Sequence, residues 1–157
     1  MKKLSNLLAA LAFVSLVIFI SCGKDDGGSA PDPLTQQAAL LQKTWNVSSV
    51  SNGSVDGNVT SEWPDFTLTI TNASSAGGTY SVSGVPAGFE VVWPTAIPSW
   101  EFQNNDEDFM LRGDGVVMEI SDIDNDNLRL EFLITTSQGA RTSVIEGNWT
   151  FIFTAAN

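Results

Sequence analysis

The chain has 157 residues, a formal net charge of −11, no histidine and a single cysteine, Cys22. This composition excludes catalysis by a Cys/His pair, zinc sites built from nitrogen and sulfur ligands, and a disulfide within the chain. The acidic surface repels nucleic acid and anionic lipid headgroups, so nucleic acid is not an expected partner. The length is that of a single domain once a targeting segment has been removed.

The first 21 residues have the pattern of a secretory signal peptide. Lys2 and Lys3 give a positive start, and an apolar stretch (LLAALAFVSLVIFI) occupies residues 7–20. As a helix with about 1.5 Å rise per residue, this stretch would extend roughly 21 Å, which is shorter than the roughly 30 Å hydrocarbon core of a bilayer. We therefore expect residues 1–21 to be cleaved, with an uncleaved membrane anchor as the alternative.

The single cysteine follows an apolar residue and a small residue in the segment FISCG, residues 19–23. This segment resembles the lipobox of bacterial lipoproteins, and the resemblance implies that Cys22 becomes the lipid-bearing N-terminal residue. Each buried CH₂ contributes about 0.8 kcal/mol, and more than one acyl chain is needed for lasting attachment. Acylated Cys22 is thus the expected contact with the outer-membrane bilayer.

Residues 22–36 are predicted to form a flexible acidic tether. Lys24, Asp25 and Asp26 come directly after Cys22 and are followed by glycine, serine and proline, a composition typical of a solvated linker. The Lys-Asp-Asp triplet resembles the export signal that sends lipoproteins of Bacteroidetes-type bacteria to the outer face of the outer membrane. The resemblance implies display on the cell exterior, and an anchor facing the periplasm is the alternative.

Residues 37–157 are predicted to form one all-β domain. A short helix or turn is expected over residues 34–43, and after Trp45 the hydrophobic period changes to two, which is typical of half-buried antiparallel strands. The clearest alternation predicts strands at residues 66–71, 80–83, 109–112, 116–120, 128–134 and 149–153.

The segment 84–99 interrupts this pattern. It contains three prolines and two glycines, which predicts a long loop or an irregular edge with a short strand at residues 89–93. Consecutive strands joined mostly by short polar turns favour an antiparallel up-and-down barrel of about eight strands, because closure removes exposed sheet edges. A β-sandwich is the alternative.

The pattern resembles the lipocalin-like domains found on many Bacteroidetes lipoproteins. The resemblance covers most of residues 40–154 and is carried by the segments 40–47 (LLQKTWNV), 100–102 (WEF), 109–112 (FMLR), 120–123 (ISDI), 128–130 (LRL) and 147–151 (GNWTF). It implies an up-and-down barrel with an apolar cavity at its open end and no cofactor. It also implies that Arg141 stacks on Trp45 through a cation–π contact.

Asp122, Asp124 and Asp126 alternate in the way that calcium ligands do. An EF-hand loop also needs a glycine and a bidentate glutamate, and the chain has Asn127 and Ile134 at those positions. A polar β-turn between the flanking strands is therefore favoured over a metal site, since Asp and Asn tolerate the left-handed backbone of turns.

The five tryptophans fall into two groups. Trp45 and Trp149 lie in alternating strands, whereas Trp63, Trp93 and Trp100 lie beside prolines or at strand ends. Exposed aromatic faces stack on sugar rings while carboxylates and amides bind the hydroxyls, so the second group is a candidate ligand or glycan platform. The favoured alternative is that all five fill the barrel core.

No pair of carboxylates is singled out as a general acid and base, and catalysis is not expected. We expect a non-catalytic, surface-exposed lipoprotein whose barrel binds a small ligand or a partner at its open end. The alternatives are a carbohydrate-binding module that accompanies glycan uptake, and a structural or adhesive surface protein with a closed barrel.

Overall fold

The computed structural model describes residues 30–55, 57–96, 98–135 and 145–156. The predicted signal peptide, Cys22, the triplet 24–26 and Arg141 lie outside these residues. The elements are α1 (Pro33–Leu41), β1 (Thr44–Asn52), β2 (Gly57–Asn58), the 3-10 helix η1 (Thr60–Glu62), β3 (Thr67–Ser74), β4 (Gly77–Ser83), β5 (Ser99–Phe102), the 3-10 helix η2 (Gln103–Asn105), β6 (Phe109–Arg112), β7 (Val117–Ile123), β8 (Asn127–Ile134) and β9 (Gly147–Ala155).

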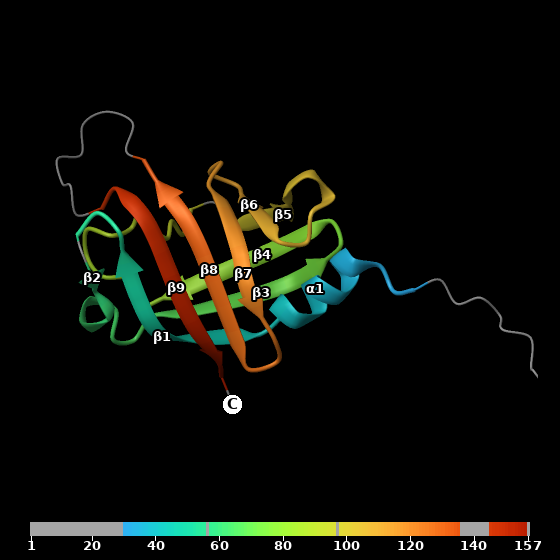
Figure 1. Ribbon diagram of the computed structural model, residues 1–157, viewed down its shortest axis with the longest axis horizontal. Helices are drawn as coiled ribbons and strands as arrows, with labels where there is room; N and C mark the ends of the chain where they lie inside the picture. Colours follow the sequence, from blue (N-terminus) through green and yellow to red (C-terminus); the bar gives the residue numbers. More distant parts are fainter. Residues whose placement is uncertain (1–29, 56, 97, 136–144, 157) are drawn as a thin grey trace, which may run out of the picture. The chain divides into compact units, whose positions relative to one another are not determined.

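The strands other than β2 form a closed antiparallel barrel (Figure 1). From β3 onward each strand pairs with the next one along the chain; β1 pairs with β3 and β9 returns to pair with β1. The two-residue β2 adds to the second half of β1. The predicted up-and-down, lipocalin-like barrel is therefore confirmed, and the sandwich alternative is wrong.

The pairing of β1 with β9 contains a register shift of the kind that a β-bulge produces. The register of β1 on β9 runs from Trp45 opposite Ala155 to Asn52 opposite Trp149 and shifts between Val47 and Ser49. An inserted residue of this kind bends a strand and increases its twist. The first part of β1 pairs with β3 on its other edge, and the last part pairs with β2.

The compact unit comprises Pro31–Asn157 and includes α1. The Asp32 side chain caps α1 by accepting hydrogen bonds from the Thr35 backbone N–H (3.2 Å) and hydroxyl (2.9 Å). Pro33 occupies the first turn, where its missing N–H is tolerated. These signals fix the start of the helix, which ends at Leu41, two residues before the expected end.

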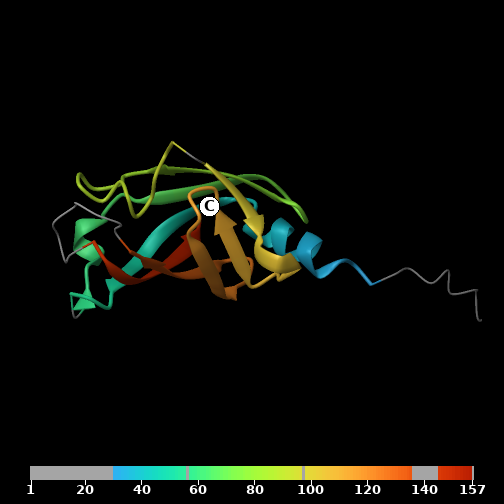
Figure 2. The same cartoon turned by 90° about the horizontal axis from the view of Figure 1, so that it is seen from above.

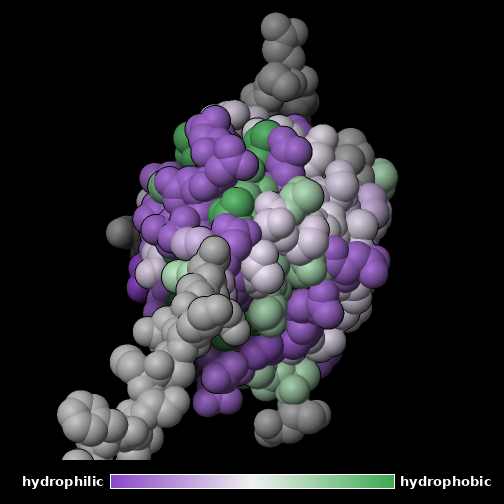
Figure 3. All heavy atoms as spheres, turned by 90° about the vertical axis from the view of Figure 1, so that its right-hand side faces the viewer, coloured by the Kyte–Doolittle hydropathy of each residue, from purple (hydrophilic) through white to green (hydrophobic). Residues whose placement is uncertain are grey.

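The barrel has two unlike ends. Figures 1 and 2 show α1 at one end and β2 with η1 at the other. At the α1 end lie the short β3–β4, β5–β6 and β7–β8 turns. We call the opposite end the loop end; it holds the long β1–β3 and β4–β5 connections and the β6–β7 turn. The face in Figure 3 mixes hydrophilic and weakly hydrophobic residues with few strongly hydrophobic ones.

The interior is packed with apolar side chains from every strand of the barrel. In β8, for example, Leu128, Leu130, Phe132 and Ile134 are buried and the intervening residues face outward, as the period of two predicts. Within the described residues no helix is long and apolar enough to cross a membrane.

Candidate functional site

Two connections at the loop end carry tryptophan side chains into the barrel. Trp63 follows η1, and Trp93 belongs to the β4–β5 connection; their exposed fractions are 0% and 1%. The expected short strand at 89–93 is absent, because this stretch consists of turns. We call the described part of the β4–β5 connection, residues 84–96, the plug segment.

These two indoles join an aromatic cluster in the barrel interior. Trp63 meets Phe66 and Phe151 edge to face, with ring centroids 5.2 and 5.0 Å apart. Trp93 meets Phe132 and Phe151 in the same way, at 5.5 Å each. Edge-to-face pairs at such distances add about 0.5–1.5 kcal/mol each beyond area burial. The cluster therefore occupies the space that a ligand would need in an open barrel.

Three indole N–H groups in this interior lack an acceptor. Among the described residues, no oxygen accepts from the buried Nε1 of Trp63, Trp93 or Trp100. By contrast, Trp45 and Trp149 each donate to the carbonyl four residues earlier, at 3.0 and 2.8 Å. A buried donor without a partner costs about 1–3 kcal/mol, and such a group calls for a physical explanation.

A buried arginine lies directly beneath the plug segment. Arg112 ends β6, and its guanidinium Nε and Nη2 donate to the two carboxylate oxygens of Asp114 at 3.0 and 2.5 Å. Its Nη1 donates to the carbonyl oxygen of Val92 at 2.6 Å. The guanidinium carbon lies 5.5 Å from the ring centroid of Trp93 and 5.6 Å from that of Phe132. Arg112 thus holds one backbone oxygen and one ring of the plug segment.

Arg112 affects the pKa values of two neighbouring groups, the Asp114 carboxyl and the Tyr80 hydroxyl. Burial alone would raise the pKa of the Asp114 carboxyl, but the hydrogen bond and charge of Arg112, with backbone N–H donors, hold that pKa below its usual value. Burial raises the pKa of the Tyr80 hydroxyl, and the charge of Arg112 opposes this rise. Both groups therefore keep their ordinary charge at neutral pH.

Tyr80 supplies a second attachment for the plug segment. Its hydroxyl donates to the carbonyl oxygen of Pro94 at 3.0 Å. At the start of the segment, Gly84 has a φ of +69°, and a Cβ built there would lie 2.3 Å from the backbone oxygen of Asp65. Glycine is required where two backbones approach this closely. The plug segment therefore passes directly over the β1–β3 connection that carries Trp63.

The candidate platform of tryptophans is not exposed. Trp63, Trp93 and Trp100 have exposed fractions of 0%, 1% and 4%, so their faces cannot stack on a sugar in this conformation. All five tryptophans are buried, which is the arrangement that the sequence favoured over an exposed platform. Prolines beside Trp63 and Trp93 correctly indicate that the two residues lie in connections between strands. Position in a connection did not mean exposure, because both connections fold into the barrel.

The acidic run between β7 and β8 forms the expected turn. One carboxylate oxygen of Asp124 accepts from the backbone N–H groups of Asp126 and Asn127, both at 2.7 Å, and this lowers the Asp124 pKa. Asp122 lies in β7, where it pairs with Arg129 in the ladder. In the described ranges no group of three His, Cys, Asp or Glu side chains could hold a metal ion.

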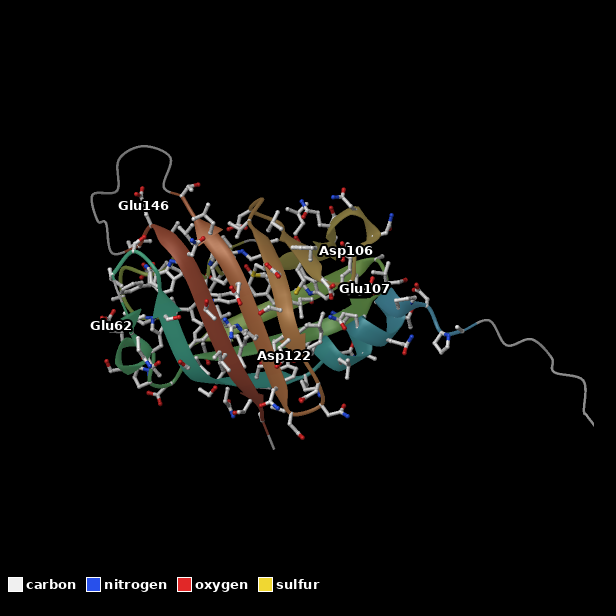
Figure 4. All side chains as sticks on the ribbon, viewed as in Figure 1. Glu62, Asp106, Glu107, Asp122 and Glu146 are labelled. Carbon is white, nitrogen blue, oxygen red and sulfur yellow. The ribbon has the colours of Figure 1, made fainter. Side chains whose placement is uncertain are left out.

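Other carboxylates are spread over both ends of the barrel. In Figure 4, Asp106 and Glu107 lie at the α1 end, whereas Glu62 and Glu146 lie at the loop end.

A hollow lies outside the barrel, on the outer face of β6–β9, with a volume of about 260 Å³. Glu119 and Glu131 stand directly opposite each other there, and Glu131 accepts from the Arg129 Nε at 2.8 Å. Leu133 and Val117 are 53% and 36% exposed. The groove is lined by Phe109, Val117, Glu119, Glu131, Phe132, Leu133, Asn148 and Trp149.

Sequence reasoning missed both Arg112 and this groove, although the alternation contained a signal for each. Arg112 has the same parity as the inward-facing Met110, which places a charge at a core position. Leu133 and Val117 are apolar at outward positions, which marks an apolar surface.

Lys43 supplies a cation–π contact to the Trp45 ring, and the contact that the lipocalin resemblance implied, from Arg141, stays a prediction. The Lys43 ammonium lies 5.0 Å from the Trp45 ring centroid, and Arg141 lies outside the described residues. No family model, no curated protein and no solved structure matches the chain. The closed up-and-down barrel is thus established by its own strand pairing, and membership of a lipocalin-like family stays a prediction.

Proposed function

We propose that this protein is a non-catalytic, lipid-anchored cell-envelope protein whose barrel binds a small ligand at the loop end. The observation that carries the proposal is the pair of tryptophans, Trp63 and Trp93, that reach the barrel interior from connections and not from strands. A side chain on a connection can leave the interior without breaking the barrel's hydrogen-bond ladder.

The backbone of the plug segment supports such a movement. Phe89 donates its N–H to Pro86, and Val92 donates to Phe89, at 3.0 and 2.9 Å; these are turn bonds and not sheet bonds. The plug segment is attached to the barrel by side-chain hydrogen bonds to the Val92 and Pro94 carbonyls and by the burial of Val92 and Trp93. The Phe89 ring also meets the rings of Trp63 and Trp149, at 5.4 and 5.9 Å. Segments with few ladder bonds open at lower free energy than the sheet that carries them.

Native mass spectrometry of residues 23–157, produced without the lipid, tests the proposal. A discrete extra mass that disappears on denaturation would support a ligand-binding barrel and give the mass of its cargo. A bare mass, together with no rise of Tm across a library of small apolar molecules, would contradict it, because a ligand that binds the folded state must stabilise that state.

The location rests on the N-terminal sequence. We propose that acylated Cys22 anchors the protein in the outer membrane and that Lys24, Asp25 and Asp26 direct it to the cell exterior. Cys22→Ala protein is expected to leave the membrane fraction, and protease added to intact cells is expected to digest the wild-type domain. Retention of the variant in membranes would overturn the anchor, and resistance to protease would indicate the periplasmic face.

A second candidate function is surface carbohydrate binding at the outer groove. Phe109 offers a half-buried ring beside two carboxylates and an amide, which are the groups that hold sugars. Phe109→Ala and Glu119→Gln are expected to abolish glycan binding without a change of fold. Glu101→Gln, an outward-facing glutamate on β5, is the matched control. An equal loss of glycan binding in all three variants would show that the glycan does not bind in the outer groove.

A further inference from the structure

We propose that the plug segment imitates the ligand, and that the ligand of the loop end is a neutral aromatic ring with an adjacent carbonyl oxygen. This inference rests on the proposed function and specifies the ligand class of the same site. Val92 presents a carbonyl oxygen to the Arg112 Nη1 at 2.6 Å, and the neighbouring Trp93 presents a ring to the same guanidinium. An oxygen next to a ring is therefore the chemistry that this interior accepts.

Displacement of the plug segment leaves specific groups without partners. The Arg112 guanidinium loses the oxygen of Val92 and the face of Trp93, while the Tyr80 hydroxyl loses the oxygen of Pro94. Phe132 remains beneath the guanidinium. A buried donor that loses its acceptor is destabilising, so the displacing molecule must supply an oxygen as well as apolar area.

The charge balance favours a neutral ligand over a carboxylate. Asp114 already accepts two hydrogen bonds from Arg112, so the buried pair has no net charge. The acceptor that Arg112 now has in the plug segment is an uncharged amide carbonyl. The 18 acidic residues of the chain, all in the part after Cys22, also oppose the approach of an anion. A carboxylate would add an uncompensated negative charge to a buried neutral pair.

Three indole probes separate these requirements. Indole-3-carboxamide has the ring and a neutral oxygen, indole-3-carboxylate has the ring and a charge, and 3-methylindole has the ring alone. Trp93→Ala removes the ring that competes with them and leaves Arg112 in place. Val91→Ala truncates an exposed neighbour in the same segment (45% exposed) and is the matched control.

Isothermal titration of the folded domain (residues 23–157) is expected to rank carboxamide above carboxylate and 3-methylindole. Trp93→Ala should bind the carboxamide about tenfold more tightly than the wild type or Val91→Ala, because the closed plug lowers the apparent affinity of a competing ligand. Arg112→Lys should fold and lose the preference for carboxamide over 3-methylindole, since lysine has no planar fork with which to hold Asp114 and the ligand oxygen together.

Tightest binding of the carboxylate, or equal binding of 3-methylindole, would overturn the inference about ligand class. If none of the probes binds Trp93→Ala while native mass spectrometry finds a retained molecule on the wild type, the inference fails and the ligand-binding barrel stands. If no probe binds and no retained mass is found, both fail.

Discussion

Trp45 at the α1 end and the tryptophans of the two connections at the loop end differ in how their indole N–H groups are satisfied. At the α1 end, the Trp45 N–H donates to the Leu41 carbonyl, and Lys43 covers the ring while donating to the Asn125 carbonyl at 2.8 Å. At the loop end, the indole N–H groups of Trp63 and Trp93 have no acceptor among the described residues. Trp149, a strand residue at the loop end, donates to the Ile145 carbonyl at 2.8 Å, so the contrast is between Trp45 and the two tryptophans of the connections.

Trp45 and Trp93 are also held by different kinds of backbone. Trp45 lies in β1, where pairing with β3 and β9 fixes its backbone on both edges. Trp93 lies in a connection whose backbone is held by turn bonds. A site that must exchange a ligand needs a low-stability element at its entrance, and a closed barrel supplies one without loss of its ladder.

The largest expected change in the free energy of unfolding comes from replacing each of the two tryptophans, Trp45 and Trp93, with alanine. Trp45→Ala should lower the free energy of unfolding by about 3–5 kcal/mol, the usual range for a large core truncation. Trp93→Ala should lower it by roughly 1–3 kcal/mol less, because it also removes a buried donor that has no acceptor among the described residues. Urea unfolding followed by circular dichroism measures both. Equal losses would mean that the Trp93 indole is as well satisfied as that of Trp45.

A smaller loss in the free energy of unfolding is expected when Arg112, which holds the plug segment, is replaced. Arg112→Met should destabilise the fold by roughly 3 kcal/mol, near the lower limit for a broken buried pair because Asp114 is partly exposed. Arg129→Met is the matched control, since Arg129 and Glu131 form an exposed pair worth about 0–1 kcal/mol. Similar unfolding midpoints for the two variants would contradict a special role for Arg112.

The smallest effect concerns acid stability. The folded pKa of Asp114 is lowered, so its contribution to stability is present above the usual aspartate pKa and is lost as the pH falls through the folded value. Asp114→Asn should flatten the decline of stability at acid pH. In an Arg112→Met background the same substitution should have less influence on that decline, since Arg112 supplies much of the lowering. An unchanged decline in both backgrounds would show that the pair does not act as a unit.

Much of the fold was readable from residue patterns. Alternation located β6, β8 and β9 within two residues, because each has one buried and one exposed face. The boundaries of β3 and β4 were less well predicted, since β3 extends through the mostly polar residues 71–74 and β4 begins at the glycines 77–78. Backbone pairing continues there without an apolar pattern to indicate it.

The candidate site was less predictable than the fold. Trp63 and Trp93 are not part of any period, so their burial follows from the path of two connections that only tertiary packing determines. The alternation of β6 places the charged Arg112 at an inward-facing position, which the sequence could have revealed. Its contact with Val92, however, joins residues 20 positions apart in the chain. Side chains that meet across a barrel leave no local signal in a single sequence.

Amide hydrogen exchange of the wild-type domain is the most direct measurement. Val92 and Phe89 in the plug segment should exchange through local opening, faster than global unfolding allows. Amides of the β1–β9 ladder such as Phe151 should exchange at the global limit. Exchange of the plug amides at the same slow rate as the ladder would mean that the loop end is permanently closed, and a ligand-binding interior would be contradicted.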